Sequence, residues 1–275
     1  MHDDVVVRRA GAATVTVDPR DGARITSLIV DGHELLHPGS GGGWTYGSFV
    51  MAPWAGRIRD GLVVHDGRAL RFPRDPDDGH GLHGLVHSAP WATTGPNSWS
   101  IELPGVAPDA DLDVTLEDPA WFAPTRIEQH LELHEDRLEL LLEVTAGTPV
   151  PATVGWHPWF RRRVAGAGAR IELPAGYMLL RDEEGIATDR RVEIPPQPWD
   201  DAFGGLTGPV AVQWGELLRL EIDHDGPTTV VYTGKDHAVC AEPQTGPPDE
   251  VNQHPRLAGP NAPVRLTSTW RWSRP

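Results

Sequence analysis

The segment Gly155-Trp-His-Pro-Trp-Phe160 places one histidine, His157, between two tryptophans. The ordinary pKa of an imidazole is about 6.5, so near neutral pH the group can both give and take a proton. Pro158 favours an extended conformation at the residue before it, as at the end of a strand. His157 is therefore a candidate acid–base group. The alternative is a structural histidine that is buried among aromatic rings with both nitrogens satisfied.

A second candidate acid–base group is Glu242, which follows the apolar run Ala238-Val-Cys-Ala241 and precedes Pro243. A carboxylate at the end of a buried strand is costly unless it is paired or used. Partial burial raises the pKa of a carboxyl group and makes it a useful base. The alternative is a strand-end glutamate that points into water.

Three histidines lie close together in the sequence, at spacings of three and four residues: His80, His83 and His87. These spacings suit metal binding on one face of a helix, but the interleaved glycines oppose a helix, and in an extended segment the three side chains do not share a face. We expect no metal site here. The glycines allow a ligand to approach the backbone closely, so His83 is expected to face a pocket, whereas His80 and His87 are equally compatible with a surface loop.

Two further segments carry groups suited to binding hydroxyls. Arg57 and Arg59 lie in a glycine-containing turn, and a guanidinium offers several fixed donors for vicinal hydroxyls or for a carboxylate. Asp200 and Asp201 offer acceptors to sugar hydroxyls. The alternatives are an ion pair of an arginine with an acidic neighbour such as Asp60, and an ordinary Asx turn at the two aspartates.

The elements expected to position these residues are β-strands. Residues 126–144 show the clearest hairpin: Ile127, Leu131 and Leu133 share one face, residues 135–136 form the turn, and residues 138–144 alternate on the return. Further strands are predicted over residues 5–17, 23–30, 69–72, 170–173, 217–222, 228–232, 238–241 and 264–272. Many short strands separated by Gly/Pro turns indicate an all-β fold, a sandwich or a barrel, with few or no helices.

Length and composition narrow the class of protein. A chain of 275 residues without an internal repeat or a linker is predicted to form a single domain over residues 1–275. Cys240 is the only cysteine, so an intramolecular disulfide is excluded, and no signal peptide or membrane span is recognised. We therefore expect a cytoplasmic protein. The formal charge of −15 argues against nucleic acid and anionic membranes as partners.

Taken together and in this order, the segments resemble the aldose 1-epimerase (galactose mutarotase) family. The residues that carry the resemblance are Ala-Pro-Trp-Ala-Gly-Arg-Ile over residues 52–58, Leu-His-Gly-Leu over 82–85 followed by Pro-Trp over 90–91, Gly-Trp-His-Pro-Trp-Phe over 155–160, Asp-Asp-Ala-Phe over 200–203, and Glu-Pro-Gln-Thr over 242–245. Gly56 stands where the family often has asparagine. The chain is also shorter than the best-known galactose enzymes.

The resemblance implies a large antiparallel β-sandwich with an open cleft, no metal and no organic cofactor. It implies that His157 is the general acid at the ring oxygen and Glu242 the base at the anomeric hydroxyl, with Arg57, His83 and Asp200 binding a free aldose. Because both groups must titrate near the working pH, a bell-shaped rate profile is expected, with its rising limb from Glu242 and its falling limb from His157. The oligomeric state, a monomer or a homodimer, and the identity of the sugar stay open, and the two arginines keep an anionic sugar among the candidates.

Three other functions are compatible with parts of the sequence. A glycoside hydrolase would use two carboxylates such as Glu242 and Asp200, and would not need His157. A sugar-binding or sugar-sensing module would use the same fold without catalysis. A metal-dependent β-barrel enzyme would use the histidines at 80, 83 and 87.

Overall fold

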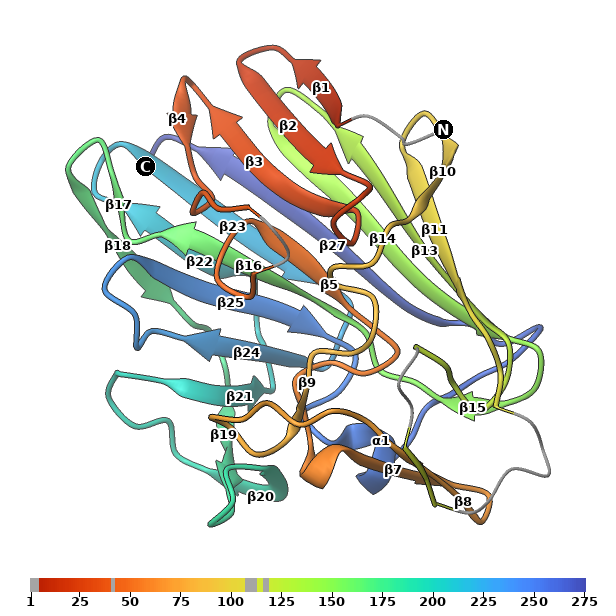
Figure 1. Ribbon diagram of the computed structural model, residues 1–275. Helices are drawn as coiled ribbons and strands as arrows, with labels where there is room; N and C mark the ends of the chain where they lie inside the picture. Colours follow the sequence, from red (N-terminus) through yellow and green to blue (C-terminus); the bar gives the residue numbers. More distant parts are fainter. Residues whose placement is uncertain (1–4, 41–42, 107–112, 116–118) are drawn as a thin grey trace.

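Alternating apolar and polar residues fold the chain into two large antiparallel sheets that pack as a β-sandwich (Figure 1). The computed structural model describes residues 5–40, 43–106, 113–115 and 119–275. The first sheet has 11 strands, with β4 (His33–Glu34) attached to β3 and the others in the order β1 (Val6–Ala10), β2 (Ala13–Asp18), β3 (Arg24–Val30), β5 (Ser48–Met51), β16 (Gly155–Arg161), β25 (Ala238–Gln244), β24 (Thr228–Tyr232), β21 (Asp200–Gly204), β19 (Tyr177–Arg181) and β20 (Ala187–Val192).

The second sheet has nine strands, and its central strands are long and regular. Their order is β10 (Ala92–Gly95), β11 (Ser98–Leu103), β13 (Thr125–Leu133), β14 (Arg137–Ala146), β27 (Val264–Ser273), β23 (Leu218–His224), β22 (Val210–Trp214), β18 (Ala167–Glu172) and β17 (Arg163–Val164). Along β14 every second residue, Leu138 to Ala146, is buried against the first sheet. Full burial of one such leucine contributes about 1.5–3 kcal/mol, which explains why the register of these strands is firmly set.

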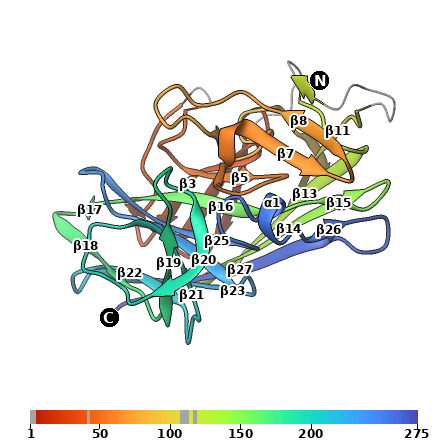
Figure 2. The same cartoon turned by 90° about the horizontal axis from the view of Figure 1, so that it is seen from below.

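Small elements cover one end of the sandwich, as the view in Figure 2 shows. They are β6 (Arg57–Ile58) paired with β9 (Gly81–Leu82), β15 (Val150–Pro151) paired with β26 (Leu257–Ala258), the sheet of β7 (Leu62–His65), β8 (Arg68–Arg71) and β12 (Asp113–Thr115), the 3-10 turn η1 (Arg59–Gly61) and the one-turn helix α1 (Glu250–Gln253). The side chain of Asn252 in α1 accepts from the backbone of Val64 and donates to the carbonyl of Leu62, which ties α1 to β7. None of the helices in the described part of the chain has the length and apolar character needed to cross a bilayer.

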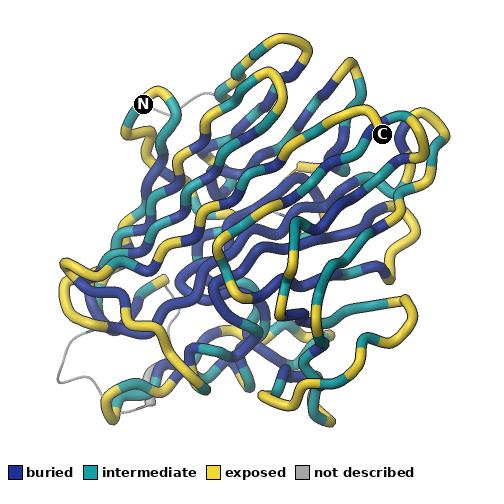
Figure 3. The backbone as a smooth tube through the Cα atoms, turned by 180° about the vertical axis from the view of Figure 1, so that it is seen from behind, coloured by how far each residue is buried: buried dark blue, intermediate teal, exposed yellow. Residues whose placement is uncertain are grey.

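The central strands β5, β16 and β25 of the first sheet are buried on both faces. In Figure 3 the buried parts of the chain gather in the middle of the molecule. Side chains alternate between the faces. Val239 and Ala241 of β25 belong to the main core between the sheets, whereas Ala238 and Cys240 belong to a second, smaller cluster on the opposite face. That second face also carries Glu242. Residues 238–241 therefore form an apolar run without a polar alternation, because both faces of the strand are covered.

The predicted all-β sandwich with few helices is confirmed, and most of the predicted strands form. The hairpin consists of β13 and β14, with Leu133 opposite Leu138 and the turn between them. Residues 5–17 form two strands of a hairpin, β1 and β2, because the chain reverses at Gly11, whose φ is +54°. The predicted strand at 238–241 extends to Gln244, so Glu242 lies within β25 and not after its end.

Candidate active site

Two neighbouring strands of the first sheet bring His157 and Glu242 together. β16 and β25 are antiparallel, with Gly155 opposite Gln244 and Trp159 opposite Cys240, so His157 and Glu242 occupy facing positions between these pairs. The distance between Nε2 of His157 and Oε1 of Glu242 is 3.3 Å, and the two side chains are only 7% and 3% exposed. Two residues that are 85 positions apart in the sequence thus form one buried pair.

The imidazole of His157 packs against two aromatic rings. Phe49 of β5 stacks with it at 4.8 Å between ring centroids, and Trp159 stacks with it at 5.0 Å. His83 meets the same imidazole edge-on at 4.9 Å. Stacked rings fix the plane of the imidazole and exclude water from its faces, so the orientation of Nε2 toward Glu242 is set before any ligand binds.

Burial shifts the pKa values of the two partners in opposite directions. Desolvation lowers the pKa of His157 well below its usual value, since the charged imidazolium loses its hydration. Desolvation raises the pKa of Glu242 well above its usual value, and the negative charge of Asp200 adds to this rise. Both shifts favour a neutral imidazole beside a protonated carboxyl. When the pair holds a single proton, that proton belongs to the two groups together.

The pair forms the floor of a cavity of about 330 Å³. All five predicted site residues, Arg57, His83, His157, Asp200 and Glu242, line it. A volume of this size lies in the range of small-molecule sites, which typically span about 300–1,000 Å³. The structure thus brings together the two candidate acid–base groups and the three residues that the sequence predicted to bind a ligand.

Arg57 is fixed at the wall of the cavity by two carboxylates. Its Nε donates to Asp78 at 2.9 Å, and its Nη2 donates to Asp200 at 3.3 Å. Burial alone would lower the pKa of Arg57, but Asp200 and Asp78 outweigh it and hold the pKa above its usual value. The preceding residue, Gly56, has φ +68°, and a Cβ there would lie 2.9 Å from Pro248, which explains a glycine at this position.

The backbone at His83 and Gly84 packs closely against residues 52–56. Its φ is +56°, its N–H donates to the carbonyl of Gly56, and Nδ1 lies 3.1 Å from the sulfur of Met51. A Cβ on the next residue, Gly84, would lie 2.1 Å from the carbonyl oxygen of Ala52, so only glycine fits. Burial, together with the neighbouring His157, lowers the pKa of His83 well below its usual value. His83 is therefore a neutral hydrogen-bonding group.

The other histidines of the 80–87 segment have structural roles. Nδ1 of His80 accepts from the N–H of Asp60, so Nε2 carries the hydrogen and donates to the carbonyl of Glu184. His87 stacks on Trp44 at 4.0 Å, and burial lowers its pKa to about 4. Within the described ranges, His80, His83 and His87 do not form a group that could share a metal ion. The structure therefore gives no support to a metal-dependent enzyme built on this segment.

Arg59 and Asp201 also lie outside the cavity lining. Arg59 forms ion pairs with Asp182 and Glu184. Asp201 binds Nε of Arg181 at 3.0 Å, and the same arginine reaches Asp200 at 3.3 Å. Of the two adjacent arginines and the two adjacent aspartates, only Arg57 and Asp200 line the cavity.

Sequence reasoning missed several residues that line the cavity: Asp75, Asp77, Asp78, Tyr232, Lys235 and Gln244. Gln244 is fully buried, its amide donates to Oε2 of Glu242 at 3.2 Å, and its own Oε1 has no partner among the described residues. Its position two residues after Glu242 on the same strand is a signal that the sequence contained. Lys235 is the only lysine in the chain, and this was a second signal that the sequence contained.

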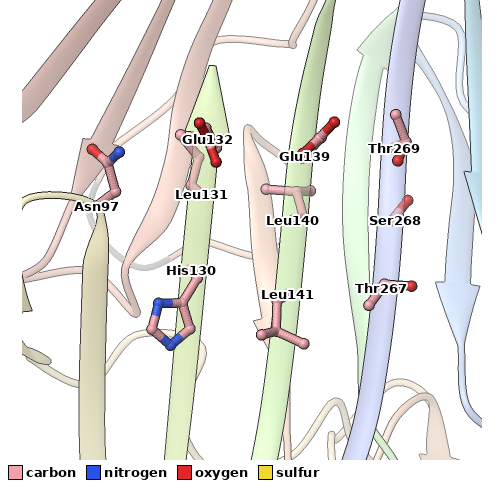
Figure 4. Close-up of a pocket in the computed structure, with 10 residues that line it drawn as sticks. All are labelled: Asn97, His130, Leu131, Glu132, Glu139, Leu140, Leu141, Thr267, Ser268 and Thr269. Atoms are coloured by element: carbon pink, nitrogen blue, oxygen red, sulfur yellow. The ribbon is translucent and has the colours of Figure 1, made fainter. Parts of the chain in front are cut away.

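A second hollow, of about 370 Å³, lies on the outer face of the second sheet (Figure 4). Apart from Asn97, which precedes β11, the labelled side chains in Figure 4 lie on β13, β14 and β27, and include Glu132, Glu139 and Thr269. His130 and Glu132 are exposed there, and the hollow contains no buried acid–base pair. The cavity at His157 and Glu242 is therefore the candidate active site.

A family model of aldose 1-epimerases matches residues 4–208, which is more than half of the chain. The chain belongs to the aldose 1-epimerase family. The match includes Arg57, His83, His157 and Asp200 and ends before Glu242. No curated protein sequence matches the chain.

Solved structures of similar fold cover the chain almost completely. A galactose mutarotase-like protein from Clostridium acetobutylicum is 14% identical, with a TM-score of 0.81, and the alignment covers 98% of this chain and 95% of that one. An aldose epimerase homologue from C. elegans is 15% identical, with a TM-score of 0.78 and coverage of 98% and 99%. A galactose 1-epimerase from Lactobacillus acidophilus is 17% identical, with a TM-score of 0.73 and coverage of 98% and 95%. At these identities the likeness shows the shared fold.

Proposed function

We propose that this protein interconverts the α and β anomers of a free aldose by opening and reclosing the sugar ring. The observation that carries the proposal is the contact of 3.3 Å between His157 and Glu242 at the floor of the cavity. Family membership supports the isomerase class. The proposal assigns the chemistry to this pair and sugar binding to Arg57, His83 and Asp200.

The chemistry requires two proton transfers. Glu242, as the carboxylate, takes the proton from the anomeric hydroxyl, and His157, as the imidazolium, gives a proton to the ring oxygen while the bond between C1 and that oxygen breaks. The open-chain aldehyde then rotates about its first C–C bond. In reclosure His157 takes the proton back from the attacking hydroxyl and Glu242 returns its proton to the aldehyde oxygen. The pair starts and ends with one proton.

The reactive form is the ion pair of an imidazolium and a carboxylate. Burial favours the neutral form in the absence of sugar. Moving the one proton from Oε1 of Glu242 to Nε2 of His157 converts the neutral form into the reactive form without exchange of a proton with water. The hydroxyl and the ring oxygen of a bound sugar then supply hydrogen bonds to both charged groups, which a dry cavity otherwise lacks.

The charges around the cavity favour an uncharged aldose. Besides Glu242, four carboxylates line the cavity: Asp75, Asp77, Asp78 and Asp200. The cationic side chains in the lining are Arg57 and Lys235. Arg57 is already paired with Asp78 and Asp200, and Arg59 is paired outside the lining. Because carboxylates outnumber cations, the local field opposes a sugar phosphate or sulfonate. We therefore propose a neutral aldose as the substrate.

The test is polarimetry on freshly dissolved α-anomers of several neutral aldoses, with an aldose 6-phosphate for comparison. We expect acceleration over the spontaneous rate for at least one neutral aldose, and little for the phosphate. Acid–base groups of this kind contribute about 10²- to 10⁴-fold, so His157→Ala and Glu242→Gln should each lose most of the acceleration. A protein that binds the sugar and accelerates nothing would be a binding module, and the proposal would be wrong.

A further inference from the structure

Beneath the acid–base pair lies the only thiol of the chain. Cys240 precedes Glu242 by two residues on β25, so both side chains point to the same face of the sheet. Its cross-strand neighbour is Trp159, which stacks on His157. One ligand atom each from His157, Cys240 and Glu242 lies within 4.8 Å of the other two. The three residues are 5%, 0% and 2% exposed.

This set of donors is the one that zinc-like ions prefer. An imidazole nitrogen, a thiolate and a carboxylate bind Zn²⁺ at about 2.0–2.3 Å, so the ligand atoms of a tetrahedral site lie about 3.3–3.6 Å apart. The nitrogen and the carboxylate oxygen are already 3.3 Å apart. The sulfur lies within 4.8 Å of both atoms, so an approach of up to about 1.2 Å brings it into the same geometry.

The three donors leave one side open. His157 and Glu242 line the cavity, so the fourth position of a tetrahedral ion faces the space where a sugar would bind. A thiolate and a carboxylate together balance the charge of a divalent ion, which offsets the cost of placing that ion in a buried site. Hard cations such as Mg²⁺ and Ca²⁺ prefer all-oxygen sites and do not fit this donor set.

We propose that His157, Cys240 and Glu242 form a binding site for Zn²⁺ and similar transition-metal ions, and that an ion in this site blocks the acid–base pair. The ion is an inhibitor and not a cofactor, since it occupies both atoms that the sugar reaction needs. Binding itself does not depend on the proposed function. Only the inhibition does.

A second histidine–carboxylate cluster provides the matched control. Glu132, His134 and Glu139 also bring three ligand atoms together, at the end of the β13–β14 hairpin. Their side chains are 66%, 30% and 42% exposed, and Arg137 already binds Glu139. We expect this exposed cluster to bind metal weakly, because its ligands are hydrated and its donor set lacks a thiolate.

The test uses the full chain after treatment with a chelator and titrates it with Co²⁺ and Zn²⁺ alone, without sugar. We expect one ion per chain and, for Co²⁺, the near-ultraviolet absorption of a thiolate-bound ion. Loss of even an outer-shell partner costs about 10- to 100-fold in metal affinity, so Cys240→Ser and Glu242→Gln should each weaken Zn²⁺ binding at least about tenfold. His134→Ala should leave the titration unchanged.

Several outcomes would overturn the site: no saturable binding by the wild type, a Co²⁺ complex without thiolate absorption, or a titration that only His134→Ala alters. Circular dichroism of each variant checks that the fold is intact. Anomer exchange measured in chelated buffer, and again with added Zn²⁺, separates the two proposals. Zn²⁺ binding without activity in chelated buffer would refute the mutarotase function alone. Activity that is insensitive to saturating Zn²⁺ would refute the inhibition.

Discussion

Two histidine–carboxylate pairs in this molecule have similar geometry and opposite electrostatics. Nε2 of His157 lies 3.3 Å from Glu242, and Nε2 of His254 lies 2.9 Å from Asp189. The first pair is 7% and 3% exposed, and the second is 61% and 77% exposed. Burial lowers the pKa of His157, whereas the hydrogen bond that His254 donates to the carboxylate of Asp189 raises the pKa of His254.

The comparison shows that the carboxylate neighbour does not by itself decide the protonation of a histidine. In water the carboxylate stabilises the imidazolium, and the exposed pair is a weak surface ion pair. Inside the sheet the loss of hydration outweighs the attraction, so the buried pair keeps a single proton that can move between its members. We propose that the buried pair uses this shared proton in catalysis.

The largest expected effect comes from removing both members of the buried pair. Because His157 and Glu242 act as one unit, the double variant His157→Ala/Glu242→Gln should lose about as much activity as either single variant, roughly 10²- to 10⁴-fold. The measurement is kcat/KM for anomer exchange. Losses that multiply in the double variant would mean that the two residues act independently. The matched control, His254→Ala/Asp189→Asn, should keep the wild-type rate.

The next largest effect is expected in the pH dependence of the activity, which the buried pair sets. At low pH the buried pair holds two protons and is inactive. As the pH rises through the lowered pKa of His157, the pair loses one proton and activity appears; as the pH rises through the raised pKa of Glu242, it loses the second and activity falls. The structure thus reverses the assignment expected from the sequence, which gave the rising limb to Glu242. A kcat/KM profile in which Glu242→Gln abolishes the high-pH fall while some activity remains would support the reversed order, and loss of only the low-pH limb would contradict it.

A smaller effect is expected at Asp200, which raises the pKa of Glu242 through its charge. Asp200→Asn should shift the high-pH limb to lower pH and reduce kcat/KM about tenfold, the equivalent of about 1.4 kcal/mol from one lost charge-assisted hydrogen bond. Asp201→Asn is the matched control, because Asp201 lies outside the cavity lining, where it pairs with Arg181 and accepts a hydrogen bond from the backbone N–H of Asp200. Equal shifts of the limb in both variants would show that Arg181, and not Asp200, sets the field at Glu242.

The smallest effect belongs to the exposed pair. NMR titration of the imidazole protons should give His254 a pKa above its usual value, while His157 stays neutral across the physiological range. A raised pKa in the folded state stabilises the fold below the unfolded pKa, and this contribution disappears as the pH rises through the folded pKa. Asp189→Asn should return His254 to an ordinary titration. If the imidazole of His157 titrates like that of His254, burial does not separate the protonation of the two pairs, and the comparison is wrong.

The sequence was sufficient for those features that local patterns encode. Strict alternation from Leu138 to Val144 predicted a strand with one buried face, and the segment forms β14 as expected. The order of five short motifs predicted the family and the residues gathered at the cavity. His83 was recognised from the glycines beside it, whose role the structure explains through the 2.1 Å approach of a Cβ at Gly84 to Ala52.

Features that depend on the pairing of strands far apart in the sequence could not be predicted from it. The register of β16 against β25 places His157 opposite Glu242 and Cys240 opposite Trp159, and no local pattern records it. The roles of His80 and Arg59 depend on contacts with residues 182–184, which are more than 100 positions away. Glu242 is buried within a central strand of the first sheet, and this burial sets the direction of its pKa shift. Both follow from the same long-range pairing of strands.

The central claim is that an imidazole stacked with Phe49 and Trp159 exchanges protons with a sugar in partnership with Glu242. The most direct measurement is chemical rescue: anomer exchange by His157→Ala with added imidazole, corrected for exchange in the same imidazole solution without protein. The account predicts that imidazole enters the vacated slot and restores part of the activity in His157→Ala, and restores none in the double variant that also carries Glu242→Gln. Equal rescue in both variants, or a wild-type protein that accelerates anomer exchange of no aldose, would contradict the account.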